Sequence, residues 1–497
     1  MPLMKVTDKN FYLLILLATT LLHVVIAVAT PVSGDEAYYW DCSRHLDWSY
    51  FDQPPLVIWA MIPFRAVFGE TNLAVRSPAI LASLLIALTL LPVVRRLGGG
   101  YREAGLAYLL LHGTPLVFLG SSYESTDIAM VAAYTMATWA AMAVADGDRR
   151  GWWGFGLTIG LGFLAKFPMV LALAVILAAV IWGEGKRHLK SATPYLAAAL
   201  AFTCTAPVWI WAAQHNWDNI AFQLEGRHQS AGFTLKFFGE YLGANLLLLS
   251  PTFAIALGAA WWIARKRMEP AWRVALVSAV TPLAFFGLLA LRSRMSPHWG
   301  APGLVVATAM LVMLTFRFKR GLVISGVIFG LALSTTVLAI VAVPEKLLEI
   351  QWAYSGRPGR VSTSSAAAII GNEEIAREVA ARLKPGEIMA SSSYTNTHLL
   401  GFLSGGELET RLANVNNGLH GLASLYWHDP EELAGGSFLF IANDRRGDLH
   451  EKLAEIFAEV EEQPPIEIHR RGRLIRSLRV LRCRGLQKPG PAFTRLE

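Results

Sequence analysis

The sequence has little charge and little cysteine. Only 16% of its 497 residues are charged, whereas 54% are hydrophobic and the mean hydropathy is +0.41. Because a soluble domain is about one-quarter charged, this composition excludes a disordered chain and argues strongly against an ordinary cytosolic enzyme. The three cysteines, Cys42, Cys204 and Cys483, form no CxxC pair. A cysteine zinc site or a thioredoxin-type centre therefore has no support.

Long apolar runs are abundant, and about 20 such residues cross a bilayer. We count eleven candidate spans, at about 11–30, 78–95, 104–120, 128–145, 154–165, 168–183, 192–213, 241–263, 272–290, 299–316 and 321–343. A cleaved signal peptide is the alternative for the first run. That run is long and has no small-residue cleavage site before Pro31, which favours a retained helix. The sequence predicts a polytopic α-helical membrane protein.

The formal net charge of +7 is concentrated in the apolar part of the chain. Residues 1–343 hold 25 Lys and Arg against 17 Asp and Glu, whereas residues 344–497 hold 19 against 20. If the N-terminus is cytoplasmic, every loop on the cytoplasmic side is basic, as the positive-inside rule requires. Membrane topology thus explains the basic excess, and no nucleic-acid partner is expected.

After Pro344 the composition becomes that of a small folded domain. The hydrophobic pattern predicts amphipathic helices over 372–384 and 448–460, buried strands over 387–393 and 437–442, and a closing pair of strands over 466–472 and 474–483. We therefore expect a transmembrane domain over 1–343 and an α/β domain over 344–497 on the outer face. The first outer loop, 31–77, is expected to contain interfacial helices over 36–46 and 54–68.

Polar residues gather at the outer ends of the predicted spans. Asp35 and Glu36 directly follow the first span, Asp127 stands at the mouth of a later helix, and Lys166 separates two apolar runs. Charge at a membrane boundary is costly unless it is used or paired. Two carboxylates and a lysine at one face suit catalysis on an anionic lipid headgroup, because a carboxylate can accept a proton while the cation holds phosphate. Solvated carboxylates in an aromatic belt, or simple helix capping, are the structural alternatives.

Two further outer segments carry candidate residues. One contains Glu225, Arg227 and His228, and the other contains Arg294 and His298. A lone histidine is more often structural than catalytic. Arginines on the outer side run against the positive-inside trend, however, which favours a role in phosphate binding.

Together these motifs resemble a known family. The segments SGDEAYYW and RHLDWSYFDQPPL, the helix-mouth Asp127, the bend FLAKFP and the turn HWGAP are similar to the bacterial branch of the protein-mannosyltransferase superfamily. That branch includes lipid A aminoarabinose transferases and rhizobial lipopolysaccharide galacturonic acid transferases. The resemblance implies a type C glycosyltransferase fold with about 11 transmembrane helices and a C-terminal periplasmic α/β domain. It also implies a multi-pass protein of the bacterial inner membrane whose active site faces the periplasm.

The resemblance implies roles for individual residues. Asp35 would be the base or the carboxylate that orients the acceptor, and Asp127 the second essential acid. Tyr39, Tyr50 and Lys166 would lie near the carrier phosphate.

A metal ion is implied less directly. Asp52 takes the place of a metal-ligand carboxylate, with Glu225 or His228 as its partner, so a divalent metal is a possible cofactor. The aminoarabinose enzymes carry Glu-Lys where this chain has Asp52-Gln53. Neutralisation of the phosphate would then fall to other cations, namely Lys166, Arg227 or Arg294, while Glu36 and Gln53 would support the site.

The resemblance thus implies an inverting glycosyltransferase that moves a sugar from a polyprenyl-phosphate donor to lipid A, lipopolysaccharide or another envelope glycolipid. Its partners would be that donor, a glycolipid acceptor and membrane lipids. A protein O-mannosyltransferase of the same fold is the nearest alternative, and a noncatalytic scaffold is a third reading. A lipid transporter or flippase fits less well, because polar residues gather on one side and no repeat is evident.

Overall fold

A computed structural model describes residues 7–226, 232–314, 320–346, 348–349, 369–416, 418–443 and 448–493. The chain packs into two compact units. The first comprises Met1–Val28, Trp48–Ala60 and Arg76–Thr335, and the second comprises Ala29–Asp47, Met61–Val75 and Thr336–Glu497. Two pieces of the first outer loop therefore pack with the tail, whereas the middle of that loop packs with the helices. The division of domains at residue 343 stays a prediction.

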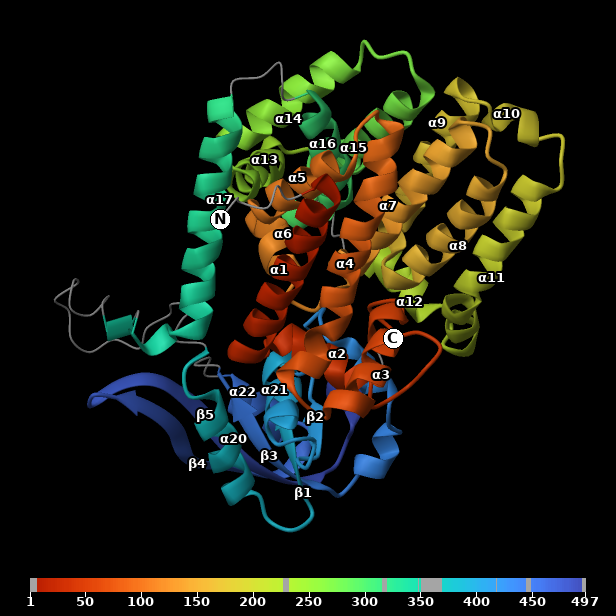
Figure 1. Ribbon diagram of the computed structural model, residues 1–497. Helices are drawn as coiled ribbons and strands as arrows, with labels where there is room; N and C mark the ends of the chain where they lie inside the picture. Colours follow the sequence, from red (N-terminus) through yellow and green to blue (C-terminus); the bar gives the residue numbers. More distant parts are fainter. Residues whose placement is uncertain are drawn as a thin grey trace. The chain divides into compact units, whose positions relative to one another are not determined.

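The first unit is almost entirely helical (Figure 1). Its elements are α1 (Asp8–Ala29), α4 (Asn72–Arg96), α5 (Tyr101–His112), α6 (Pro115–Gly120), α7 (Thr126–Ala145), α8 (Arg150–Ala165), η1 (Phe167–Leu171), α9 (Ala172–Trp182), α10 (Gly185–His188), α11 (Thr193–Gln214), α12 (Asp218–Ala221), η2 (Phe222–Gly226), α13 (Leu235–Leu249), α14 (Pro251–Ala264), α15 (Pro270–Leu289), η3 (Pro297–Gly300), α16 (Ala301–Leu314) and most of α17 (Arg320–Ala342). Helix α3 (Leu56–Phe68) is divided between the two units at Ala60, and the residues of α4 up to Val75 belong to the second unit.

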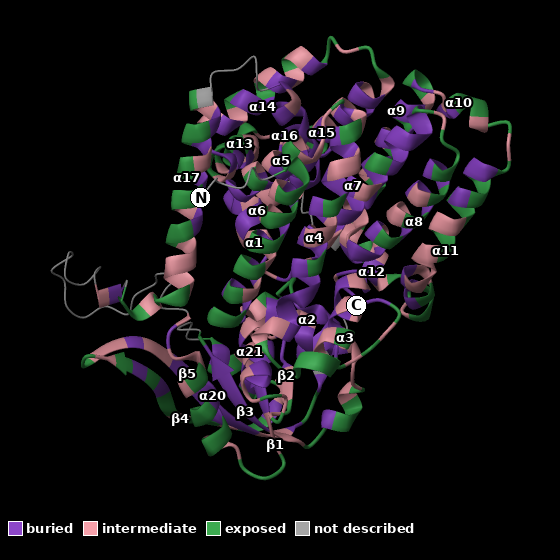
Figure 2. Cartoon of the chain, in the orientation of Figure 1, coloured by how far each residue is buried: buried purple, intermediate pink, exposed green. Residues whose placement is uncertain are grey.

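Among the described residues, seven helices are long and apolar enough to cross a membrane, or eight if the bent pair α13–α14 is one span. This confirms a multi-pass helical protein but not the expected count of eleven spans. The difference arises at short helices: α5 has 12 residues and α8 has 16, fewer than the roughly 20 that cross a bilayer. Figure 2 shows many exposed and intermediate residues along α11 and α17, where only 22% of each apolar window is buried.

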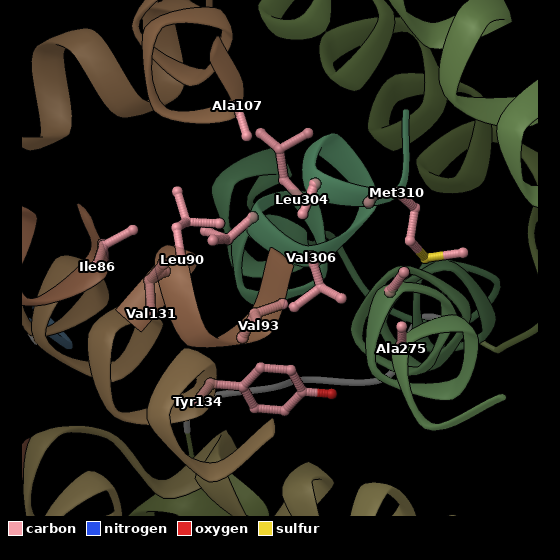
Figure 3. Packing of buried hydrophobic residues seen from close by; sticks show 14 of the residues in the cluster. Ile86, Leu90, Val93, Ala107, Val131, Tyr134, Ala275, Leu304, Val306 and Met310 are labelled. Carbon is pink, nitrogen blue, oxygen red and sulfur yellow. The ribbon is translucent and has the colours of Figure 1, made fainter. Parts of the chain in front are cut away.

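The core of the first unit lies between α4, α5, α7, α15 and α16 (Figure 3). Small residues let these helices approach closely. A Cβ atom on Gly303 of α16 would lie 2.3 Å from the carbonyl oxygen of Ala279 on α15, and one on Gly156 of α8 would lie 2.3 Å from that of Ala197 on α11. Such close packing of small residues is typical of helix association in membranes.

The second unit is a mixed α/β structure. Its elements are α2 (Gly34–Cys42), most of α3, α20 (Asn372–Arg382), β1 (Glu387–Ser391), α21 (Tyr394–Leu403), β2 (Thr410–Leu412), η5 (Leu422–Tyr426), η6 (Pro430–Leu433), β3 (Ser437–Ala442), α22 (Leu449–Ala454), β4 (Phe457–Arg470), β5 (Arg473–Leu486) and α23 (Gly490–Phe493). The five-stranded sheet has the order β2-β1-β3-β5-β4. The first three strands in this order are parallel, while β5 pairs antiparallel with both β3 and β4.

Both faces of the sheet are covered. On one face, Leu439 and Val480 pack with α20 and α21, and on the other, Phe440 and Leu481 pack with α22 and Phe493. This confirms the sheet domain in the tail. The helix expected over 448–460 is wrong in its second half, because α22 ends at Ala454 and β4 begins at Phe457. Pairing with β5 across a long antiparallel register outweighs the helical pattern there.

Candidate active site

Asp127 and Lys166 form an ion pair in the first unit. Asp127 lies in the first turn of α7, and Lys166 lies at the joint between α8 and η1, where its backbone is extended (φ −160°, ψ 135°). The Lys166 Nζ atom donates to Asp127 Oδ1 over 2.6 Å, and the two side chains are 14% and 20% exposed. The lysine that interrupts two apolar runs thus has a carboxylate partner 39 positions earlier in the chain.

His298 joins this pair from η3. Its Nε2 atom lies 3.6 Å from Asp127 Oδ2. The neighbouring Trp299 presents its ring to Lys166, with the Nζ atom 5.5 Å from the ring centroid. Two of the predicted site residues, Lys166 and His298, therefore lie against the carboxylate of a third, Asp127. A half-buried cation, a carboxylate and an imidazole in contact can bind an anionic group and transfer a proton.

Asp35 lies in the second unit, in the first turn of α2. The N-cap of that helix is Ser33, whose hydroxyl accepts from the Glu36 backbone while the Glu36 carboxylate accepts from the Ser33 backbone over 2.9 Å. This reciprocal capping box satisfies the start of the helix. The capping alternative for Asp35 is therefore wrong: the cap is Ser33. Glu36 is fully buried in this role, whereas Asp35 is exposed.

The Asp35 carboxylate accepts a hydrogen bond that the sequence did not indicate. Tyr394, the first residue of α21, donates its hydroxyl to Asp35 Oδ1 over 2.5 Å. The two residues are 359 positions apart. No local pattern of spacing or periodicity could have linked them.

A second polar contact joins α2 to α21. The Asp41 carboxylate and the His398 Nδ1 atom are 2.8 Å apart, and their side chains are 6% and 1% exposed. Burial raises the pKa of the Asp41 carboxyl, but the hydrogen bond from His398 and the charges of His398, His45 and Arg44 outweigh burial and lower it below its ordinary value. His45 itself stacks on Trp427 at a centroid distance of 4.1 Å.

The middle of the first outer loop packs in the first unit, near the π-helical turn η2. The Gln223 side chain donates to the Asp52 carbonyl over 3.0 Å, and the rings of Phe51 and Phe222 lie 4.7 Å apart. Tyr50 is buried, and its backbone N–H donates to the Gln53 carbonyl. Gln53 is also buried, and its Nε2 atom makes no hydrogen bond to any part of the chain that the structure describes.

The other predicted residues are placed differently. Tyr39 is partly buried in the second unit, where its ring lies 5.9 Å from that of Tyr38. Arg294 is 73% exposed and pairs with Glu240 of α13 over 3.0 Å.

The predicted metal set is largely undescribed. Arg227 and His228 lie outside the described residues, as does the side chain of Glu225. Within the described ranges, no three His, Cys, Asp or Glu side chains are grouped so as to hold a metal ion.

The fold is that of a type C glycosyltransferase. The chain matches the structure of ArnT from Cupriavidus metallidurans in the apo state over 99% of its own length and 100% of that chain, with a TM-score of 0.61 and 14% identity. It matches the structure of the same protein bound to undecaprenyl phosphate with a TM-score of 0.61 and 15% identity, over 98% and 99% of the two chains.

The sequence comparisons agree with this fold, and they confirm the family resemblance. Residues 52–211 match the family of dolichyl-phosphate-mannose-protein mannosyltransferases. The lipid A galacturonosyltransferase RgtD of Rhizobium johnstonii is 26% identical over 378 residues, which are 74% of this chain and 77% of that protein. The undecaprenyl phosphate-alpha-4-amino-4-deoxy-L-arabinose arabinosyl transferase of Edwardsiella ictaluri is 33% identical over 208 residues, 37% of each chain. The undecaprenyl phosphate-alpha-4-amino-4-deoxy-L-arabinose arabinosyl transferase 1 of Sodalis glossinidius is 30% identical over 301 residues, which are 53% of this chain and 53% of that protein.

Proposed function

We propose that this protein is an inverting glycosyltransferase that moves a sugar from a polyprenyl-phosphate donor to lipid A, lipopolysaccharide or another envelope glycolipid. The relationship to a lipid A galacturonosyltransferase across 77% of that relative carries the proposal. Other relatives are named for an undecaprenyl-phosphate-linked aminoarabinose. The fold shared with ArnT supports the same class of reaction.

The proposed reaction is a single displacement. An acceptor hydroxyl oxygen attacks the anomeric carbon, and the bond from that carbon to the phosphate oxygen breaks on the opposite face. The carrier phosphate leaves with the bonding electron pair, and the hydroxyl proton passes to a carboxylate. A positioned base contributes about 10²–10⁴-fold, and we assign that role to the exposed carboxylate of Asp35.

Lys166 is assigned to the leaving phosphate. Its cation is held at a fixed place by Asp127, 2.6 Å away, and a preorganised charge stabilises the negative charge that develops on the phosphate. Asp127 is the second acid of the site, because it orients Lys166 and faces His298. Tyr39, Tyr50, Arg227 and Arg294 remain proposed contacts of the carrier.

A divalent metal remains a prediction. Carboxylate and imidazole donors such as Asp52, Glu225 and His228 would suit one. Contact between the segment of Asp52 and that of Gln223 supports this grouping. Of these three side chains the structure describes that of Asp52, and the roles assigned above are those of the chain's own residues.

The cellular placement is also proposed. Basic residues on alternate loops of the apolar region support a multi-pass protein of the bacterial inner membrane, with the active site and the tail domain in the periplasm.

A protein acceptor is the second candidate, because the family matched over residues 52–211 is named for protein mannosylation. One experiment separates the two acceptors: mass spectrometry of envelope lipids, lipopolysaccharide and periplasmic proteins from cells with and without the gene. We expect a sugar to disappear from a glycolipid in the deletion strain, and to return with the wild-type gene but not with Asp35→Asn. Loss of sugar from protein alone would favour the second candidate, and full activity of Asp35→Asn would contradict the proposed mechanism.

A further inference from the structure

We propose that Tyr394 is a positioning residue for Asp35, so that helix α21 of the tail domain takes part in the transfer reaction. This inference rests on the proposed function, in which Asp35 accepts the proton of the acceptor. The observation that carries it is the 2.5 Å hydrogen bond from the Tyr394 hydroxyl to Asp35 Oδ1. A bond of this length between a hydroxyl and an ionised carboxylate is among the stronger hydrogen bonds in proteins.

Packing contacts hold the Tyr394 ring in place independently of its hydrogen bond to Asp35. Gly421 has a left-handed backbone (φ +70°), and a Cβ atom at that position would lie 2.4 Å from Tyr394 Cβ. Only glycine allows the chain to pass this close to the ring. The Tyr38 ring packs edge-on against the Tyr394 ring, with a distance of 6.1 Å between the ring centroids. The hydroxyl is therefore presented from a rigid ring, as a preorganised donor should be.

The starts of the two helices are in direct contact as well. A Cβ atom on Gly34, the residue before Asp35, would lie 2.5 Å from Thr395 Cβ, the residue after Tyr394. At the far end of α2, Asp41 and His398 make the buried contact of 2.8 Å. Helix α2 is thus held against α21 at both ends, and rotation of the Asp35 side chain is restricted by the hydrogen bond between them.

The hydrogen bond from Tyr394 orients the Asp35 carboxylate for proton transfer. A carboxylate has about four lone-pair positions, so a hydrogen bond to Oδ1 leaves capacity for the acceptor proton while fixing the plane of the group. Misplacing a catalytic group by about 1 Å can cost about 100-fold in rate. Loss of the Tyr394 hydroxyl should therefore lower the rate of transfer without weakening donor binding.

The test uses full-length protein in membranes of the deletion strain. The donor is the polyprenyl-phosphate lipid fraction extracted from wild-type cells and added in a dilution series. Tyr394→Phe keeps the ring against Gly421 and removes only the hydroxyl. We expect the maximal rate to fall about 10- to 100-fold, with the apparent donor KM within about twofold of wild type.

Tyr38→Phe is the matched control. The Tyr38 hydroxyl accepts from the Ala423 backbone over 3.2 Å in the same unit, so Tyr38→Phe tests the loss of a hydroxyl near α21 other than that of Tyr394. We expect this variant to retain the wild-type rate per folded molecule, with folding measured by thermal denaturation.

A double variant separates positioning from general stability. If Tyr394 acts through Asp35, Tyr394→Phe should have no further effect on the residual rate of Asp35→Asn. An additional loss there, a wild-type rate for Tyr394→Phe alone, or a loss that matches the unfolded fraction would each overturn the inference while leaving the role of Asp35 intact. A wild-type rate for Asp35→Asn would instead overturn the proposed mechanism itself.

Discussion

The ion pair of Lys166 and Asp127 offers a prediction that separates catalysis from folding. Exposed pairs contribute about 0–1 kcal/mol, whereas breaking a fully buried pair by removing one partner costs about 3–5 kcal/mol. With side chains 14% and 20% exposed and atoms 2.6 Å apart, this pair lies between these limits. Lys166→Met should therefore destabilise the protein by about 2 kcal/mol, because the Asp127 charge loses its partner.

The effect of Lys166→Met on donor binding should be of similar size. A second substitution, however, should change donor binding and stability differently. Loss of one charge-assisted contact to phosphate costs about 1.5–3 kcal/mol, which corresponds to an increase of about 10- to 150-fold in the apparent donor KM. Adding Asp127→Asn to Lys166→Met removes both charges, so stability should recover. Donor affinity should not recover, because the cation is still missing.

The assay combines thermal denaturation with transfer kinetics over a donor dilution series. Arg96→Met is the control, since Arg96 pairs with Asp146 over 3.0 Å just beyond the other end of α7. It should lower stability slightly and leave the donor KM unchanged. If the double variant regains both stability and donor affinity, the pair is structural only and Lys166 does not hold phosphate.

Two more predictions follow from topology and from titration. Reporter fusions at Arg150 and at Gly371 should lie in opposite compartments, because the loop at Arg150 is basic and the tail is nearly neutral; equal compartments would contradict the span assignment. Because the pKa of Asp41 is lowered in the folded protein, its ionised form stabilises the fold above its ordinary pKa of 3.8, and this contribution is lost as pH falls through the folded value. Thermal denaturation of Asp41→Asn should show a lower midpoint at pH 7 and a smaller loss of stability between pH 5 and pH 3 than wild type, and parallel curves would refute the assignment.

Much of this fold could be predicted from periodicity and charge. The apolar runs that became α1, α4, α7, α11 and α15 are long and uninterrupted, so length alone identifies them. The hydrophobic pattern predicts a buried strand over 437–442, and β3 occupies Ser437–Ala442. The count of spans could not be predicted, because runs near 154–165 and 168–183 are short and broken by Lys166 and Pro168, and local hydropathy does not decide whether such segments cross.

The contact of Asp127 with Lys166 could be anticipated only in part. Both residues stand at the same ends of predicted spans, so topology places them at one face, but the 2.6 Å contact depends on the packing of α7 against α8 and η1. The role of Tyr394 had no signal at all in the spacing of residues. The close approaches at Gly34 and Gly421 are visible only once the chain is folded, because a glycine in a sequence does not indicate which residue will pack against it.

Burial sorts the five carboxylates between residues 35 and 52 of the first outer loop in a way that composition cannot. Glu36 and Asp41 are buried, the first in the capping box with Ser33 and the second against His398. Both carboxylates therefore stabilise the local structure. Asp47 and Asp52 are partly exposed, whereas Asp35 is exposed and also held by a rigid hydroxyl. A catalytic base must be both reachable by substrate and fixed in orientation. Among these five, Asp35 combines exposure with a hydrogen bond from a rigid ring, which is why the proposed transfer chemistry is assigned to it.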